Sequence, residues 1–305
     1  MNFGMLLNPT TPTSRTLRQQ EAHLAWMLVL PALLYLLLIM LLPFLWAIYI
    51  SMTNKVVGVP GKFIGLQNYI HAVQDRGFQN AIINTFQYTF GAVVGKVTMG
   101  IILALVVHSK VLQFKSIFRA LLLLPWTLPI IVVTLTWKWM FSDVGGVLNH
   151  ILLTFGIINS KIFWLATPVM AKLSVIIVNV WRGTPFIGIS VLAALQVIPN
   201  ELYEAASIDG ANVLLRFRHI TIPGIRDALS IATLVTTIWT FNSFPLVWQL
   251  TGGGPADKTQ IVATYSYVVG FSNYYLGRAI AISILFLPVM FIFVNRVTKR
   301  TLRAV

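Results

Sequence analysis

The stretch GGGPADKT at residues 252–259 comes within one residue of a phosphate-binding loop. That loop has the pattern G-x-x-x-x-G-K-[ST], in which backbone amides surround the phosphates of a nucleotide. Asp257 stands where the pattern requires its second glycine. A carboxylate there would face the phosphates and hinder the close approach of the backbone. Whether the near-match means nucleotide chemistry depends on the elements that hold it.

The composition of the 305-residue chain indicates an integral membrane protein. Its residues are 57% hydrophobic and only 10% charged, and the mean hydropathy is +0.81. A soluble domain carries about 25% charged residues, so this chain has too few to cover a water-facing surface. It has no cysteine, which excludes disulfides and thiolate metal sites and leaves the compartment open.

Six stretches are long enough to cross about 30 Å of hydrocarbon as helices of roughly 20 residues. They cover residues 25–50, 82–107, 117–141, 169–196, 228–250 and 279–297. The predicted fold class is an all-α polytopic membrane protein, with a transmembrane domain at 25–297 and short cytoplasmic segments at 1–24 and 298–305. The first stretch is too long for a signal-peptide core and lacks a cleavage site, so we expect it to be retained.

Twelve of the 22 Lys and Arg residues fall on the side that carries both termini, which predicts that this side is cytoplasmic. Most of the net charge of +14 is thus a topology signal, and no basic patch points to nucleic acid. In this orientation GGGPADKT lies on the outer face and follows a helix, whereas a nucleotide loop follows a strand. We therefore interpret it as a Gly/Pro turn that leaves the membrane.

The cytoplasmic connection between the fourth and fifth spans has an unusual pattern for a loop. Asn200 is predicted to cap a short helix, with Glu201 and Glu204 in its first turn. Gly210 ends that helix, and a second amphipathic helix is expected to continue until Pro223. Such a helix pair either docks on a partner protein or lies on the lipid interface, and the residues alone leave both open.

This connection resembles the EAA loop of ABC importer permeases. The matching residues are Glu204, Ala205, Ala206, Asp209, Gly210, Ala211, Ile220 and Pro223. More narrowly, the chain resembles the MalF-type, carbohydrate-uptake branch over about residues 25–300. The motifs that match in order are GLQNY (65–69), NTF (84–86), LLPWTLP (123–129), NVWRGTPF (179–186) and LTGGGP (250–255). The extra N-terminal spans and large outer insertion of the maltose member are missing, so the chain resembles the compact form.

The resemblance implies a permease subunit that moves a mono- or oligosaccharide across a bacterial or archaeal cytoplasmic (inner) membrane by alternating access. The implied partners are a second, homologous (MalG-type) permease, a homodimeric ABC ATPase that carries ATP and Mg²⁺, and an extracytoplasmic sugar-binding protein. The chain itself would bind no cofactor or metal and would not be an enzyme. The resemblance assigns ATPase coupling to Glu204, Ala205, Ala206, Asp209, Gly210 and Pro223.

Two predicted spans carry amides, hydroxyls and aromatic rings of the kinds that bind sugars, in VNVWRGTPF and TIWTFNSFPLVWQL. Polar residues are costly inside a bilayer, so such clusters are informative. The family's sugar contacts, carried over by position, fall on Asn179, Gly183, Phe186, Trp239, Thr240 and Ser243. Local chemistry alone adds Asn242, which helical spacing places near Trp239 and Ser243. The alternative is that these polar groups tie helices together.

Two cationic residues lie in the middle of predicted spans. Arg182 could attract an anionic substrate such as a sugar phosphate, or pair with a carbonyl or a partner's acid, and we favour the structural role. Lys96 is expected to face the bundle interior.

The sequence also argues against three other kinds of site. The five histidines have no metal-ligand spacing, and no intramembrane carboxylate pair suits proton coupling. A proton-driven carrier and an enzyme acting on lipid-linked sugars are therefore weaker rivals. The same importer architecture with a polyol or glycerol phosphate as cargo stays open.

Overall fold

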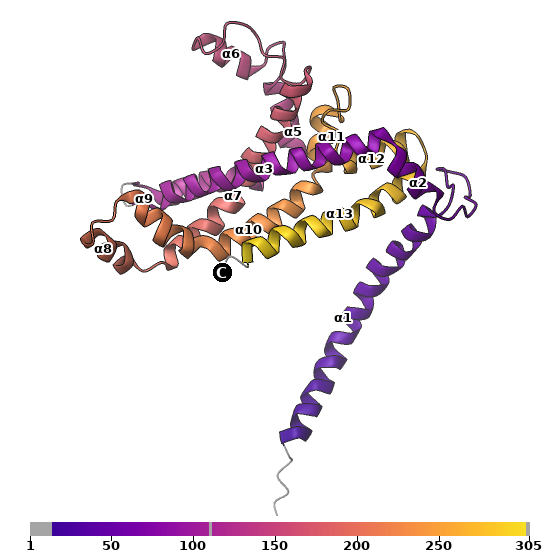
Figure 1. Cartoon of the computed structure of the whole chain (residues 1–305), viewed down its shortest axis with the longest axis horizontal. Helices are drawn as coiled ribbons and strands as arrows, with labels where there is room; N and C mark the ends of the chain where they lie inside the picture. The colour runs from indigo at the N-terminus through magenta and orange to yellow at the C-terminus, as the bar shows by residue number, and fades with distance from the viewer. Residues whose placement is uncertain (1–13, 110–111, 303–305) are drawn as a thin grey trace, which may run out of the picture. The chain divides into compact units, whose positions relative to one another are not determined.

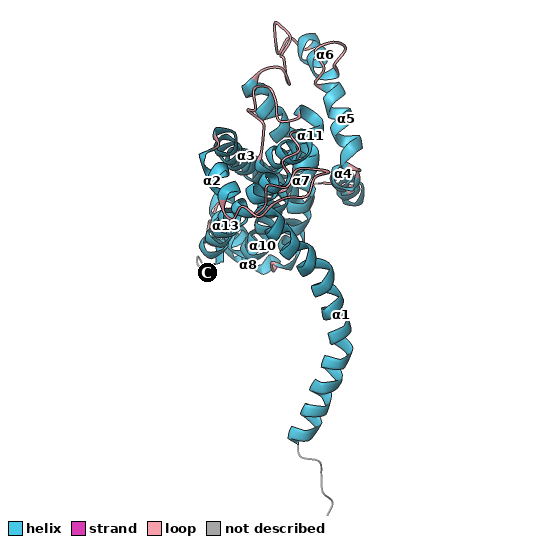
Figure 2. Cartoon of the chain, turned by 90° about the vertical axis from the view of Figure 1, so that its right-hand side faces the viewer, coloured by secondary structure: helices cyan, strands magenta, loops and turns pink. Residues whose placement is uncertain are grey.

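The computed structural model describes residues 14–109 and 112–302, which are mostly helical (Figure 2). Within those residues there is no β-strand, only the isolated bridges Thr53–Phe63 and Val56–Val59. The first elements are α1 (Ser14–Ser51), α2 (Gln67–Gln74), α3 (Arg76–His108), α4 (Lys115–Thr127), α5 (Ile130–Met140), α6 (Val147–Thr154) and α7 (Pro168–Val197). They are followed by α8 (Asn200–Ile208), α9 (Val213–Arg216), the π-helix η1 (Phe217–Thr221), α10 (Ile222–Phe241), α11 (Phe244–Thr251), α12 (Val262–Tyr267), the π-helix η2 (Val268–Ser272) and α13 (Leu276–Leu302).

The helices divide into two units, residues 1–50 and 51–305. The first unit is the apolar helix α1, whose described side chains are largely exposed and which contains Pro31 and Pro43. Residues 1–13 and 303–305, which belong to the expected terminal segments 1–24 and 298–305, lie outside the described residues. Within the described residues, α1 begins before residue 25 and α13 ends after residue 297, so both helices extend into the expected terminal segments.

Four single helices of the described chain are long and apolar enough to cross a membrane. They are α1, α3, α7 and α13, and the count rises to six if two bent helix pairs each form one span. The third and fifth expected spans, residues 117–141 and 228–250, are these pairs.

The third expected span is broken at Leu128–Pro129, where α4 and α5 meet at 93°. The residue before a proline is disfavoured in the helical region, and Leu128 is extended with ψ 139°. The expectation of one helix over 117–141 is therefore wrong in its geometry. The fifth is bent by 48° between α10 and α11, at Asn242 and Ser243.

Helices α3 and α7 pack along each other at the centre of the second unit, with α10 against both and α13 against α10 (Figure 1). Glycines allow the closest approach. A Cβ added at Gly95 would lie 2.6 Å from Cγ2 of Val180, and one at Gly100 would lie 2.5 Å from Cγ2 of Ile187. Small residues at such contacts let helix backbones approach closely, which is how helices gain packing energy inside a bilayer.

The connection after α7 forms the short helix α8, and a second helical segment, α9 and η1, then continues directly into α10. Pro199 precedes α8, so Asn200 is its first helical residue and does not cap it; Asn212 caps α9 instead, accepting from the Leu215 N–H at 2.9 Å. Gly210 ends α8 with φ +79°, as expected. The expected end at Pro223 is wrong, because α9, η1 and α10 are continuous and Pro223 lies within this run of helix, two residues after the π-helical turn η1.

The GGGPADKT segment is a turn. Gly252 ends α11 at φ +62°, and Gly253 follows at φ +95°. The Thr259 hydroxyl donates to the Gly254 carbonyl at 2.7 Å and thereby closes the turn on itself. Because a helix precedes it, the segment lacks the strand–loop–helix context of a nucleotide-binding loop, and the prediction of a helix-ending turn is confirmed.

Candidate functional site

A small cavity lies where α3, α4, α7 and the bent pair α10–α11 meet. Its volume is about 60 Å³. We call it the central cavity; it is lined by Lys96, Trp126, Asn179, Arg182, Gly183, Phe186, Thr236, Trp239, Thr240, Ser243 and Leu246. Pockets that enclose a small-molecule ligand measure about 300–1,000 Å³, so this wall of side chains does not enclose a ligand by itself.

Asn179 joins α7 to two neighbouring elements at this wall. Its side-chain amide donates to the hydroxyl of Tyr88 on α3 at 2.5 Å and to that of Ser243 at 3.0 Å. Its Oδ1 is buried and has no hydrogen-bond partner among the described residues. A buried acceptor without a partner is costly, so the described side chains leave this oxygen unsatisfied beside the cavity.

Lys96 reaches the same wall from α3 and is 3% exposed. Its ammonium donates to the hydroxyls of Thr240 at 2.8 Å and Thr236 at 3.4 Å. The side chain crosses α7 at Gly183, where an added Cβ would lie 2.6 Å from Cε of Lys96. Gly183 therefore makes room for Lys96, and α7 stays continuous through Gly183 and Pro185.

Three aromatic side chains form a row beside these polar groups. The rings of Phe186 and Trp239 have centroids 4.8 Å apart, and those of Trp126 and Phe186 are 6.4 Å apart and nearly parallel. Trp239 is 49% exposed and Trp126 is 43% exposed. Open aromatic faces beside amides and hydroxyls can receive the apolar faces of a sugar ring.

The structure brings six of the seven expected substrate-binding residues to this cavity. Asn179, Gly183 and Phe186 are three or four positions apart on α7 and share one face. Trp239, Thr240 and Ser243 come from the end of α10 and the break after it. Asn242 does not line the cavity, because the helix ends at Phe241; its side chain is exposed and donates to the Ile238 carbonyl at 3.1 Å.

Three residues that line the cavity were not expected from the sequence, whereas Lys96 was. Trp126, Thr236 and Leu246 gave no local signal, although Trp126 lies within the LLPWTLP motif. The expectation that Lys96 faces the bundle interior is confirmed. Arg182 lines the cavity as well.

The residues expected to couple to an ATPase lie on α8 and in the turn after it, except Pro223, which lies near the start of α10. Glu204, Ala205, Asp209, Gly210 and Pro223 are exposed. Ala206 is half-buried on the same helix. Apolar neighbours are exposed too, with Ile208 at 87%. Figure 1 shows α8 and α9 together at one end of the helix bundle formed by α3, α7 and α10.

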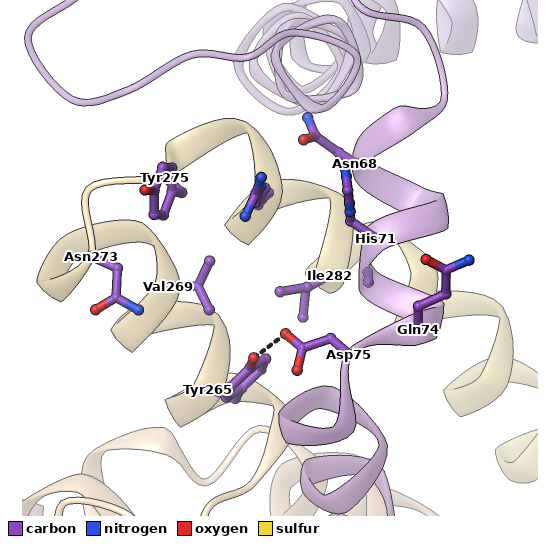
Figure 3. Close-up of a pocket in the computed structure, with 11 residues that line it drawn as sticks. Asn68, His71, Gln74, Asp75, Tyr265, Val269, Asn273, Tyr275 and Ile282 are labelled. Atoms are coloured by element: carbon purple, nitrogen blue, oxygen red, sulfur yellow. Dashed lines mark hydrogen bonds between the residues drawn. The ribbon is translucent and has the colours of Figure 1, made fainter.

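A second, larger pocket separates α2 from α12, η2 and α13, with a volume of about 380 Å³ (Figure 3). We call it the α2–α13 pocket; it includes His71, Gln74, Asp75, Tyr265, Asn273 and Arg278. The Tyr265 hydroxyl donates to the Asp75 carboxylate, and burial, followed by this hydrogen bond, raises the pKa of Tyr265. No spacing in the sequence brings these residues together, because they come from separate elements that are far apart in the chain.

The motifs of the sequence are linked to one another in space. Asn84 of NTF donates to the Asp257 carbonyl at 2.9 Å, and Thr85 accepts from the Val262 N–H at 2.9 Å. Asn68 of GLQNY donates to the carbonyls of Ser51 and Thr53 at 2.8 and 2.7 Å. These amides hold the turn after α11 and the segment before α2 in place.

Residues 96–303 match the family described as the binding-protein-dependent transport system inner membrane component. The match covers the central cavity and α8. The chain belongs to this family. Its relatives place it in the carbohydrate-uptake, MalF-type branch of the ABC permeases, so it is a multi-pass inner-membrane protein.

Two relatives show the degree of similarity. The trehalose/maltose transport system permease protein MalF of Thermococcus litoralis is 35% identical over 87% of this chain and 90% of the relative. The lactose transport system permease protein LacF of Rhizobium radiobacter is 35% identical over 86% of this chain and 88% of the relative.

Among solved structures, the permease resembles a chain of a bacterial alginate ABC transporter crystallised with an alginate pentasaccharide-bound periplasmic protein. The TM-score is 0.79 at 22% identity, over 93% of this chain and 96% of that chain. At this identity the likeness concerns the fold alone.

Proposed function

We propose that this permease forms part of the membrane pathway of an ATP-driven importer of a mono- or oligosaccharide. The observation that carries the proposal is that Asn179, Gly183, Phe186, Trp239, Thr240 and Ser243 gather at one cavity. The cavity offers a buried free acceptor, hydroxyls and an open aromatic row, which together suit a polyhydroxylated ring. The relatives named for trehalose/maltose and lactose transport support a sugar as the cargo.

The proposed architecture has six spans, with a transmembrane domain at 25–297 and both termini, 1–24 and 298–305, in the cytoplasm. In this arrangement each bent pair crosses the membrane once. Proline-broken helices are acceptable there because the break lines a cavity. Asn242 and Ser243 would lie at depth in the membrane, at the bend of the fifth span.

A second, MalG-type permease would complete the sugar site. The central cavity of this chain is far smaller than a pocket that encloses a ligand, and Trp126 and Trp239 are open at its edge. A homologous subunit would bring a matching wall across a pseudo-twofold axis and cover these rings. An extracytoplasmic binding protein would then deliver the sugar to the closed pathway.

The energy would enter through α8. Glu204, Ala205, Ala206, Asp209, Gly210 and Pro223 would contact a homodimeric ABC ATPase that binds ATP and Mg²⁺, and this chain would bind neither. Closure of the ATPase dimer would draw α8 and its counterpart in the second permease together and turn the cavity outward. Hydrolysis would then return the cavity to its inward-facing state. The exposed apolar surface of α8 and α9 is the surface expected of such a contact.

The test is affinity purification of the full chain from its native membranes in mild detergent. We expect an ABC ATPase to co-purify with the wild type and to be lost with Glu204→Lys, because the exposed carboxylate lies on the proposed contact. Asp143→Lys makes the same charge reversal in the connection between α5 and α6 and should leave the complex intact. Recovery of the wild type without any ATPase would reject the importer and favour a stand-alone secondary transporter.

A polyol or glycerol phosphate in place of the sugar is the second candidate cargo. It is favoured by one feature, the position of Arg182 on the cavity wall. Uptake assays with the purified complex in proteoliposomes, using labelled disaccharides and glycerol 3-phosphate in parallel, separate the two.

A further inference from the structure

Two cationic side chains share the wall of the central cavity. Lys96 reaches it from α3 and Arg182 from α7. The Lys96 stem passes α7 at Gly183, the residue next to Arg182, where an added Cβ would lie 2.6 Å from Cε of Lys96. Arginine keeps its charge in any protein environment, so at least one full positive charge faces this cavity.

No carboxylate offsets these charges within the described part of the chain. None of the residues that line the cavity is acidic, and no hydrogen bond or ion pair joins Lys96 or Arg182 to an Asp or Glu. Lys96 is bonded to neutral threonine hydroxyls. The Arg182 side chain has no hydrogen-bond partner among the described residues, and its Nε is buried.

An uncompensated cation is expensive at this depth in a membrane protein, where water cannot solvate it freely. Buried charges are therefore paired, or mark the place where a ligand brings the opposite charge. Lysine carries three donors, of which the threonines use two, and the planar guanidinium of Arg182 can hold two oxygens of one anion at once. The two side chains are suited to a carboxylate, phosphate or sulfonate.

We propose that the central cavity binds an anionic group carried by the transported sugar, with Arg182 and Lys96 as its cationic contacts. This inference rests on the proposed function and narrows the substrate class to acidic sugars. A carboxylate from the second permease would satisfy the charge alone. An acidic sugar would satisfy the charge, the free Oδ1 of Asn179 and the aromatic row together, because all three line one cavity.

The experiment measures uptake by the complete transporter, with its binding protein, in proteoliposomes. The probes are trehalose, maltose and lactose, each beside its 6-phosphate and its 6-uronate. We expect the wild type to take up charged members in preference to the neutral parents. In Arg182→Gln and Lys96→Gln the ratio of charged to neutral uptake should fall about 10- to 100-fold, the loss expected for a hydrogen bond to a charged group.

Lys172→Gln is the matched control, since it removes the same charge from α7. Lys172 is half-buried, bonds Gln87 at 2.7 Å and does not line the central cavity. Its uptake ratio should equal that of the wild type. Co-purification of all subunits with each variant, and its melting temperature, show whether the complex still assembles.

Four results would overturn the inference. If the wild type prefers neutral sugars, or if the uptake ratio is unchanged in Arg182→Gln, Arg182 and Lys96 do not select the substrate by its charge. Loss of the second permease from the Arg182→Gln complex, with uptake of charged and neutral sugars lost together, would locate the counter-charge in that subunit. If no sugar of either kind is taken up while the ATPase co-purifies, the sugar assignment itself fails.

Discussion

The central cavity and the α2–α13 pocket hold polar side chains in opposite ways. In the central cavity, Asn179 and Lys96 are buried and depend on other side chains for every hydrogen bond. In the α2–α13 pocket, His71, Asn273 and Arg278 are exposed, and water can solvate them. An unpaired polar group is costly only where water cannot replace its partner. The same substitution should therefore have different effects in the two regions.

The largest difference is expected from asparagine-to-alanine substitutions. Asn179→Ala leaves the hydroxyls of Tyr88 and Ser243 without their shared donor and should cost about 3 kcal/mol of stability. Asn273→Ala in the α2–α13 pocket removes an exposed amide and should change stability by less than about 0.5 kcal/mol. Thermal unfolding of the purified protein in one detergent measures both.

Equal melting temperatures for these two variants would break the comparison. Such a result would mean that water already reaches Asn179, so that the central cavity is as well solvated as the α2–α13 pocket. A Ser243→Ala variant then shows whether Asn179 has found another acceptor.

A smaller effect is expected from adding one methyl group to α7. Gly183→Ala would place a Cβ 2.6 Å from Cε of Lys96 and should cost about 2 kcal/mol, because Lys96 must leave its threonine partners. Gly188→Ala is the matched control on the same helix, where the nearest atom, Cδ2 of Leu122, lies at 3.4 Å. The two melting temperatures should differ; a Gly183→Ala variant as stable as Gly188→Ala would show that Lys96 is mobile.

The smallest effect is expected at the hydrogen bond between Tyr265 and Asp75 in the α2–α13 pocket. Tyr265→Phe removes the donor to Asp75 and should cost about 1 kcal/mol. Tyr267→Phe is the control, because Tyr267 packs through its ring on Trp248 and Phe271. Hydrogen exchange should report the loss locally, at α2 and α12.

The pH dependence of this stability has a definite sign. The pKa of Tyr265 is higher in the folded protein than in the unfolded chain, so its stabilisation is complete below about pH 10 and is lost as the pH rises beyond that value. The difference between wild type and Tyr265→Phe should therefore shrink in alkaline buffer. A difference that grows with pH would contradict the neutral hydroxyl as donor.

The sequence predicted the long helices well because each is specified by its own residues. A run of apolar residues at helical length defines α3, α7 and α13 without reference to the rest of the chain. The breaks were harder to predict. Prolines occur inside α7 and α13, which stay continuous, and also at Pro129 and Pro245, next to the bends. Whether a proline breaks a helix depends on what neighbours can satisfy the freed backbone groups, and that is decided by packing.

The same distinction holds for the cavity. Asn179, Gly183 and Phe186 could be predicted to share a face because helical spacing places them there. Asn242 was misplaced because the helix ends one residue before it, after which the side chain bonds its own helix. The role of Gly183 as the passage for Lys96 could not be predicted, since the two residues are far apart in sequence and meet only across the α3–α7 contact.

By itself, the sequence determined the membrane class of the chain, the approximate positions of its long helices and the permease family to which it belongs. These properties follow from apolar runs and from motifs that are each contiguous in the chain. Only the tertiary structure decided that Lys96 and Arg182 share one cavity without a carboxylate, and that His71, Asp75 and Tyr265 form a second pocket. Such constellations arise where separate helices pack side by side, and no local spacing encodes the partner that a buried side chain will meet.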